Sequence, residues 1–344
     1  MTAAPHSFGG GYAQPQQQSQ QPAMRPAGAV VIPGQVAAGH GDTQLDSAPQ
    51  TQLGQFWSSF RSHRLAFIGL CTLLTMSAIC LFLPFVLVSP EEIDMSVLAA
   101  TPPSAAHPFG TDMIGRDVLS RLVNAGRISL MIGFFVAIIA AAVGSTVGVV
   151  AGYFGGKLDG ALMWLVNVIM TIPTIPLMIS VAVLVASPTS KLGVVFGSIP
   201  EAWRIIIVLS ALGWMGISRV VRSQVLSLRQ QEFVEAAMAL GAKSPRIMFI
   251  HILPNSVSVI AVFTTLAVSG ALLSEAAMSF LGVGVQPPTA TWGNMLSEAR
   301  DLFTILKYWW LAWFPAFAIL ITVLSVNFVG DGVRDALDPK TQKK

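Results

Sequence analysis

Charged residues are scarce in this sequence. Only 11% of its 344 residues are Asp, Glu, Lys or Arg, whereas 53% are hydrophobic, and the net charge is only +3. A soluble globular domain has about 25% charged residues, so this chain lacks the polar surface needed to face water. The composition therefore predicts a membrane protein, and the small, scattered net charge gives no reason to expect a nucleic-acid partner.

Groups that carry chemistry are also few. Cys71 and Cys80 lie nine residues apart in one apolar run, which separates them by roughly 13 Å along a helix, too far for a disulfide. The five histidines lack metal-ligand spacing, and neither HExxH nor GxSxG occurs. The closest match to a phosphate-binding loop, GYFGGKL, has Leu158 where Ser or Thr must hold Mg²⁺. We therefore expect no catalytic residues, no metal site and no cofactor held by the chain itself.

The first 52 residues are rich in Gln, Pro, Gly and Ala and hold almost no aromatic residues. Such a segment buries too little apolar area to offset its ordering entropy, which predicts a disordered tail over 1–52. We expect no signal peptide there. The remainder divides into 53–127, with the first membrane helix and an external loop, and a core at 128–344.

Long hydrophobic runs make up most of the remainder. A membrane helix needs about 20 mostly apolar residues to cross the hydrocarbon layer. Runs of this kind stand at 65–88, 128–151, 161–186, 203–220, 259–281 and 308–329. The sequence therefore predicts an all-α, polytopic membrane protein with six transmembrane helices.

Lys and Arg are divided unequally between the two sides. Six spans place both termini on one side, which carries thirteen of these residues against seven on the other. Because positive residues accumulate on the cytoplasmic side, both termini and the 219–258 loop are predicted to be cytoplasmic. The opposite loop, 89–127, is rich in acids, and its amphipathic end, RDVLSRLVNAGRI, predicts a short helix on the outer membrane surface.

Glycines recur every four residues through the second run and just past it. In lipid, small residues on one helix face let two backbones approach closely and gain dispersion contacts. We expect a close helix contact there, either static or at a sliding or subunit interface, formed by Gly144, Gly148, Gly152 and Gly156.

Two prolines and one acid interrupt the hydrophobic runs. Pro173 and Pro176 lie inside the third run, where proline removes a backbone hydrogen bond and kinks the helix. The kinked helix either lines a translocation path or only fits the bundle. Glu275 is the one acid deep in an apolar run, where it either lines a cavity or forms a hydrogen-bonded helix contact. All three residues are candidates for a translocation path.

The stretch EFVEAAMALGAKSPRIMFIHILPN, here called the bracket (232–255), separates the fourth and fifth runs. Its first residues are good helix formers, and Gly241 stands where a left-handed residue ends a helix. Ser244 and Pro245 then match the cap and first position of a second helix that runs to Pro254. The pattern predicts a helix, a sharp turn and a helix on the cytoplasmic side.

Small and acidic side chains give the first helix of the bracket a distinctive face. Ala236 and Ala237 would form a smooth surface that fits a groove on another protein, and Glu232 and Glu235 would pair with its basic groups. A purely structural helix at the membrane interface is the alternative.

Several motifs resemble one transporter family. Glu235-Ala236-Ala237, then Gly241, then Leu253-Pro254 resembles the EAA loop of ABC importer permeases, and His251 makes it similar to the dipeptide, oligopeptide and nickel branch. Four further segments resemble the C-type subunit of that branch, namely HPFGTDMIGRDVLSRL, AGYFGGKLD, SFLGVGVQPPTATWGNML and VNFVGDGVRDALDPK. Two features depart from it: Trp164 and Asn167 stand where members often carry Arg and Asp, and the tail is longer than usual.

The resemblance implies a non-enzymatic permease subunit of an ATP-driven importer in the bacterial cytoplasmic membrane, with the ABC importer permease fold. Its cargo would be dipeptides, oligopeptides or a related cargo such as nickel, and the sequence leaves that choice open. The implied partners are a B-type permease subunit, two ATP-binding subunits that hold ATP and Mg²⁺, an extracytoplasmic substrate-binding protein and membrane lipid. Coupling to the ATP-binding subunits would use Glu232, Glu235, Ala236, Ala237, Gly241, His251, Leu253 and Pro254. The alternative is a stand-alone, ion-coupled transporter that uses Glu275.

Overall fold

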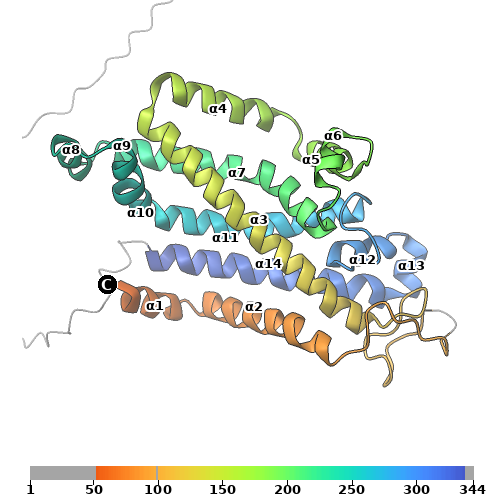
Figure 1. Ribbon diagram of the computed structural model, residues 1–344. Helices are drawn as coiled ribbons and strands as arrows, with labels where there is room; N and C mark the ends of the chain where they lie inside the picture. Colours follow the sequence, from red (N-terminus) through yellow and green to blue (C-terminus); the bar gives the residue numbers. More distant parts are fainter. Residues whose placement is uncertain (1–51, 98–99, 338–344) are drawn as a thin grey trace, which may run out of the picture. The chain divides into compact units, whose positions relative to one another are not determined.

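The computed structural model describes residues 52–97 and 100–337. The tail predicted over 1–52 therefore lies outside the described residues, except for Gln52. Every regular element that the structure describes is a helix, which confirms the all-α prediction, and two isolated β-bridges join residues of the loop between α2 and α3 (Figure 1). The helices are α1 (Gln52–Ser62), α2 (Arg64–Phe82), η1 (Leu83–Phe85), α3 (Val118–Phe154), α4 (Gly156–Thr171), α5 (Thr174–Ala186), α6 (Lys191–Phe196), α7 (Glu201–Leu228), α8 (Glu232–Ala239), α9 (Ser244–Arg246), the π-helix η2 (Ile247–Ile252), α10 (Leu253–Asn255), α11 (Val257–Phe280), α12 (Trp292–Glu298), α13 (Leu302–Lys307) and α14 (Trp309–Leu337).

Five of the described helices are long and apolar enough to cross a membrane: α2 with η1, α3, α7, α11 and α14. The pair α4 and α5 makes a sixth if it counts as one broken span. This agrees with the six spans predicted from the hydrophobic runs. Several helices are longer than those runs, because good helix formers continue beyond the apolar residues.

The second span differs most from its prediction. α3 has 37 residues, a length of roughly 55 Å, whereas the hydrocarbon core is about 30 Å thick. Asp117 caps its start, where its carboxylate accepts a hydrogen bond from the Ser120 amide at 2.7 Å. The prediction of a separate helix on the outer surface is therefore wrong: the amphipathic run is the first part of α3. No proline or left-handed glycine interrupts the helix before Gly155, so the two stretches are continuous.

The third span is broken rather than gently kinked. α4 and α5 meet at 93° across Ile172 and Pro173. Proline disfavours the helical conformation of the residue before it, and Ile172 is extended, at φ −80° and ψ 131°. Pro176 causes no break, because it lies in the first turn of α5, where backbone N–H groups have no partner within the helix. The predicted bend thus belongs to Pro173 alone.

Glycines bring α3 and α7 together. A Cβ atom added to Gly144 or Gly148 would lie 2.6 Å from a backbone oxygen of α7, and one on Gly152 would lie 2.8 Å from Val225 Cβ. These three residues lie where α3 and α7 approach each other closely. Gly156 was wrongly included: it begins α4 at φ +55°, and an added Cβ would meet nothing within 4 Å.

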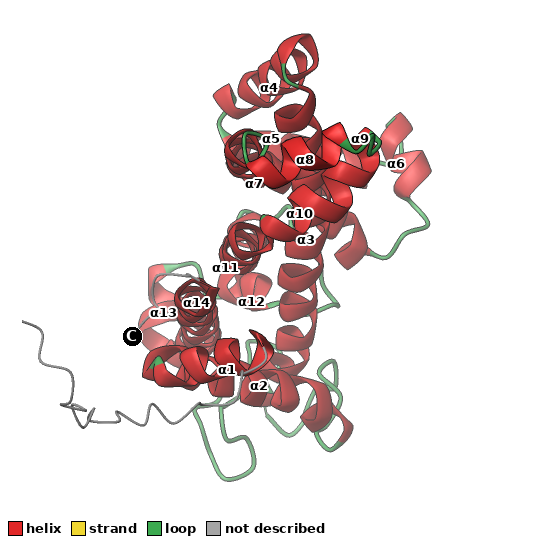
Figure 2. Cartoon of the chain, turned by 90° about the vertical axis from the view of Figure 1, so that its left-hand side faces the viewer, coloured by secondary structure: helices red, strands yellow, loops and turns green. Residues whose placement is uncertain are grey.

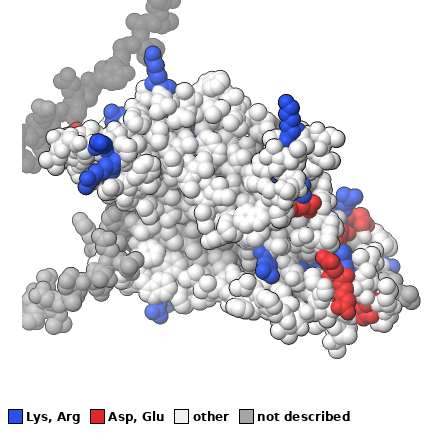
Figure 3. Space-filling view, viewed as in Figure 1, with Lys and Arg blue, Asp and Glu red and all other residues white. Residues whose placement is uncertain are grey.

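The two ends of the bundle carry different features. In Figure 1, α1, the C-terminal end of α14 and the helices α8 to α10 lie at one end, and the outer loop (86–117) lies at the other with α12 and α13. Acidic side chains gather at the outer-loop end (Figure 3). This arrangement places the bracket at the same end of the bundle as α1 and the last turn of α14, which agrees with the predicted six-span topology.

The short helix α1 was not predicted. Phe60 is 3% exposed and packs with Ala66 and Ala336, so α1 is held against the start of α2 and the end of α14. Figure 2, which looks onto this end of the bundle, shows α1 beside α2 and α14, while α8 to α10 lie near α3 and α7. Between α1 and α2, His63 accepts a hydrogen bond from the Ala66 amide and caps α2.

Candidate functional site

The bracket forms the helix, sharp turn and helix expected from its sequence. After α8, Gly241 has φ +77°, the left-handed conformation predicted for it. The Ala242 amide donates to the Ala237 carbonyl at 3.1 Å, and the Gly241 amide donates to that of Met238 at 2.9 Å. This pair of bonds is a Schellman motif, which satisfies the last carbonyls of α8. The sharp turn is therefore fixed locally.

The second half of the bracket differs in detail from its prediction. Its helix starts after Lys243, and Ser244 is the first helical residue without a side-chain cap bond, so the predicted cap is wrong. The chain then forms a π-helix, with the Leu253 amide donating to the Met248 carbonyl. Pro254 provides the reason, because it has no N–H and its ring would clash with the carbonyl four residues earlier in an α-helix. Such π-helical turns are rare in proteins overall, but those that do occur are often found at functional sites.

Apolar side chains seat the bracket on the membrane helices. Val234 is 0% exposed and Ala237 is 8% exposed, and they pack in one cluster with Ile247, Ile252 and residues of α3 and α7. Ala237 therefore faces inward, and the prediction that both alanines form the outer face is wrong for it. A period of three residues places Val234 and Ala237 on the same side of α8. The buried side of α8 is thus joined to the η2 segment and, through one apolar cluster, to α3 and α7.

The opposite side of α8 is open. Glu232, Glu235 and Ala236 are exposed, and so are large apolar side chains, with Phe233 41%, Met238 40% and Leu240 88% exposed. Carboxylates beside an exposed apolar strip fit a groove that is apolar at its base and basic at its rim. In the second half of the bracket, His251 and Leu253 are half-buried, whereas Pro254 is exposed.

An ion pair that the sequence analysis missed ties α4 to α7. The Arg222 guanidinium binds both oxygens of the Asp159 carboxylate, with Nη2 at 2.6 Å from Oδ2. Such a two-bond pairing fixes the relative orientation of the helices. Trp164 and Asn167, which depart from the family pattern, lie on the same helix as Asp159 and are exposed. No spacing rule finds the pair, because its members are 63 residues apart.

A large cavity opens between α4, α7 and α11. Its volume is about 1150 Å³, and its lining includes Asn167, Arg219, Arg222 and Gln224 among apolar residues. A smaller cavity of about 70 Å³ adjoins the break in the third span, where Ile172 and Thr174 line it. The cavity is also lined by Leu177, so residues next to both Pro173 and Pro176 contribute to it, although neither proline is among its lining residues.

Glu275 lies in a hydrogen-bonded contact. Its carboxylate is 1% exposed and accepts from Ser279 at 2.7 Å and from Ser129 at 3.4 Å. The Ser129 hydroxyl also accepts from the Trp292 amide at 3.2 Å. Glu275 therefore joins α11 to α3 and to the start of α12, which fits the structural alternative for this residue.

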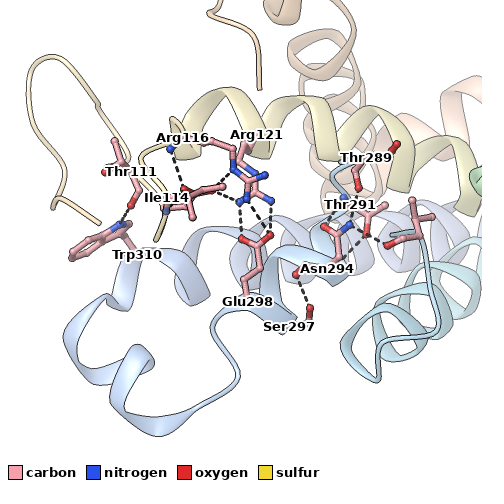
Figure 4. Close-up of polar contacts among 12 residues, drawn as sticks. Thr111, Ile114, Arg116, Arg121, Thr289, Thr291, Asn294, Ser297, Glu298 and Trp310 are labelled. Carbon is pink, nitrogen blue, oxygen red and sulfur yellow. Dashed lines mark hydrogen bonds and ion pairs between the residues drawn. The ribbon is translucent and has the colours of Figure 1, made fainter. Parts of the chain in front are cut away.

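Four charged residues form an outer cluster, consisting of Asp112, Arg116, Arg121 and Glu298 (Figure 4). Arg121 is 3% exposed and donates to Asp112 and to both oxygens of Glu298, each at 2.6 Å. A buried charge is tolerated only when it is paired and hydrogen-bonded in this way. The cluster holds the outer loop, α3 and α12 together. Sequence analysis missed it, because the Arg121 and Glu298 positions are 177 residues apart.

The segment before α12 is fixed by backbone contacts next to this cluster. The Thr291 hydroxyl accepts from the Asn294 amide and caps α12, and the Asn294 side-chain oxygen accepts from the Thr291 amide, which completes a capping box (Figure 4). Asn294 Nδ2 also donates to the carbonyls of Val285 and Thr289, at 3.2 and 2.8 Å. The outer end therefore presents an ordered surface.

His107 holds the outer loop to the start of α3. Its Nδ1 lies 3.0 Å from Asp117 Oδ1, and its Nε2 lies 3.3 Å from Asp94 Oδ2. Among the described residues, no group of His, Cys, Asp and Glu is arranged to hold a metal ion. The two contacts of His107 tie the outer loop to the cap of α3.

Comparisons with known proteins agree with the sequence motifs. Residues 144–343, more than half of the chain, match the family of binding-protein-dependent transport system inner membrane components. Residues 51–103 match the N-terminal transmembrane domain of oligopeptide transport permease C. This second match covers the first span and part of the outer loop.

Relatives of similar length support the same assignment. The dipeptide transport system permease protein DppC of Bacillus subtilis is 39% identical over 290 residues, covering 83% of this chain and 85% of the relative. The oligopeptide transport system permease protein OppC of the same organism is 36% identical over 311 residues, covering 89% and 96%. DppC of Haemophilus influenzae is 36% identical over 308 residues, covering 88% and 99%. The resemblance seen in the motifs is confirmed, and the chain belongs to the family of inner membrane permease components of binding-protein-dependent ABC transport systems.

Proposed function

We propose that this chain is the C-type permease subunit of an importer for dipeptides or oligopeptides, and that the bracket couples it to ATP-binding subunits. As an inner membrane component, the chain is a multi-pass, non-catalytic subunit of its transport system. The cargo class is proposed from the relatives, whose names describe dipeptide and oligopeptide transport.

The two-sided structure of α8 carries the proposal. Its inner side is anchored through Val234 and Ala237, while its outer side exposes Glu232, Glu235 and apolar side chains. A helix of this kind transmits a push or pull from a bound partner to α3 and α7. The proposed partner surface is a groove on each of two ATP-binding subunits, one for this chain and one for a second, B-type permease.

The remaining partners fit other surfaces. The cavity lined by Asn167, Arg219 and Gln224 is open in the single chain, and we assign it to the translocation path, which the B-type subunit would complete on the other side. Pro173 would allow the broken third span to move at that path. At the opposite end, the outer loop and the segment 283–307 would receive the substrate-binding protein. Coupling to an ion gradient through Glu275 is not favoured, since its carboxylate is buried and bound by two serines.

The coupling role can be tested with two matched glycine variants. Gly241 and Gly282 both end helices in Schellman motifs, at φ +77° and +81°, and an added Cβ would meet nothing within 4 Å at either. Valine at either position imposes a similar backbone strain, of order 1–3 kcal/mol, but only Gly241 lies in the bracket.

We expect Gly241→Val to reduce peptide uptake. The variant should also lose its ATP-binding subunits during purification, while the chain still inserts into the membrane. Gly282→Val should lose comparable thermal stability yet retain the ATP-binding subunits during purification. The measurements are uptake of labelled di- and oligopeptides, in cells lacking other peptide importers, and the ATPase activity of the purified complex. Normal uptake by Gly241→Val would contradict the coupling role, and failure of the wild type to import any peptide would contradict the cargo.

A further inference from the structure

A second large cavity forms a groove that begins at the outer end of the molecule and continues past its middle, where Val329 on its wall belongs to the same apolar cluster as Leu70 and α1. Its volume is about 1020 Å³, and four helices, α2, α3, α11 and α14, contribute to its walls. It is separate from the bracket and from the cavity assigned to the translocation path. The groove is defined here by Leu73, Ser77, Leu81, Arg127, Met131, Phe134, Phe135, Val268, Val329 and Glu91.

The outer part of the groove has apolar walls over a length that matches one leaflet. Phe135 lies eight residues beyond Arg127 on α3, and Leu73 lies eight residues before Leu81 on α2. Each separation corresponds to roughly 12 Å along a helix. Half of the hydrocarbon core is about 15 Å thick, so these two wall segments extend nearly to the middle of the membrane, and Thr265 and Val329 continue the groove beyond them.

The mouth of the groove carries one charge of each sign. Arg127 and Glu91 both line it, and both are exposed. Neither forms an ion pair or side-chain hydrogen bond with any described residue. Arg127 directly precedes the apolar run 128–151, which places the guanidinium at the level of the lipid headgroups. Basic side chains at this level pair with lipid phosphates.

We propose that this groove is a binding site for a glycerophospholipid of the outer leaflet with an ethanolamine headgroup. The phosphate would bind Arg127, the ammonium would bind Glu91, and an acyl chain would lie along Leu81, Met131 and Phe134. Opposite charges at the mouth match a zwitterionic headgroup, whereas an anionic glycerol headgroup would leave Glu91 facing a negative group. The bound lipid would fill the space between α2 and the core helices.

The test uses the full-length chain in its purified transporter, incorporated into nanodiscs of phosphatidylethanolamine and phosphatidylglycerol. Tightly held lipid is counted by mass spectrometry after delipidation. We expect wild type to retain phosphatidylethanolamine and Arg127→Gln to retain roughly tenfold less, since the loss of a hydrogen bond to a charged group typically weakens binding by about this factor. Arg300→Gln is the matched control, because Arg300 is also exposed near the outer end but lines no part of this groove. Glu91→Gln should remove the preference for ethanolamine over glycerol.

A second measurement identifies what occupies the groove. A photoreactive amino acid at Ser77 should form an adduct with the mass of a phospholipid, and Leu81→Trp, which fills the groove without changing its charges, should reduce that adduct. Cross-linking of Ser77 to the second permease subunit would overturn the proposal and assign the groove to a protein helix. Equal lipid retention in wild type and Arg127→Gln, with both proteins folded, would overturn it as well. Either result leaves the proposed coupling role of the bracket intact.

Discussion

His107 lies between two carboxylates, Asp94 and Asp117, that can only accept hydrogen bonds when ionised. A neutral imidazole has one N–H and donates to one of them, whereas the imidazolium donates to both. The hydrogen bond with Asp117 is the main cause that raises the pKa of His107 above its ordinary value of 6.5, while partial burial opposes it. Asp94 stays ionised, because hydrogen bonds from Ser96 lower its pKa.

The stability of the outer loop should therefore depend on pH. A histidine whose pKa is raised by folding contributes stability fully below the unfolded value, and this contribution is lost as the pH rises through the folded value. We expect wild type to unfold at a higher temperature than His107→Gln at pH 5.5, and the difference to shrink above neutral pH. Thermal unfolding of both proteins in detergent, from pH 5.5 to 8.5, measures this difference in unfolding temperature. A difference that grows with pH would contradict the imidazolium bridge.

Which residues could be predicted depends on how far along the chain their partners lie. The left-handed conformation of Gly241 follows from neighbouring residues alone, because the helix formers before it and the Schellman bonds are local. Arg121 and Arg222 gave no such signal, since Glu298 and Asp159, which each bind one of them through both carboxylate oxygens, come from other helices. The inward orientation of Ala237 was missed for the same reason: the α3 and α7 residues that cover it are distant in sequence.

The contact of α3 with α7 depends on the absence of side chains along one face. A Cβ atom on Gly148 would lie 2.6 Å from the Ser218 carbonyl oxygen and 2.8 Å from Val221 Cβ. Because the nearest atom belongs to the backbone of α7, a clash there can be relieved only by moving the helices apart. Overpacking of this kind typically costs about 1–3 kcal/mol.

We expect Gly148→Ala to lower the free energy of unfolding by an amount in that range. Gly270→Ala is the control, because Gly270 is also inside a membrane helix but an added Cβ meets nothing within 4 Å. This second variant should be neutral or slightly stabilising, since alanine favours a helix. Denaturant titration of both proteins in mixed micelles compares them, and equal effects would argue against a tight α3–α7 contact.

At the level of helices, hydropathy identified the membrane-crossing segments but not all their limits. An apolar run ends where polar residues begin, whereas a helix ends at a cap or a breaker. α3 starts at Val118, directly after its cap Asp117, and thus well before its apolar run. The break at Pro173 was foreseeable from proline chemistry, but the separate effect of Pro176 required knowing which residue begins α5. The wide turn before Pro254 likewise reflects a local clash that hydropathy does not register.

For the molecule as a whole, the two ends should be accessible from opposite sides of the membrane. Glu235 lies in the bracket and Glu92 in the outer loop, and both are exposed. The native cysteines both belong to α2 within the first apolar run, so they add little reaction with water-soluble reagents.

We expect Glu92→Cys to react with a membrane-impermeant maleimide in intact spheroplasts, and Glu235→Cys to react only in inside-out vesicles. The physical reason is that Lys and Arg near the spans hold the bracket side in the cytoplasm. Labelling is read by the mass shift of the full-length chain. The reverse pattern would mean that the charge count, which predicted the orientation from composition alone, gave the wrong sign.

The outer cluster has a consequence for how the protein is made. Arg121 is synthesised 177 residues before Glu298, an interval of roughly 10 to 35 s at a translation rate of 5–20 residues per second. During that time Arg121 has only Asp112 and water as partners. The outer end is completed only when the segment containing Glu298 has crossed the membrane, so the second carboxylate partner of this buried arginine arrives late in synthesis.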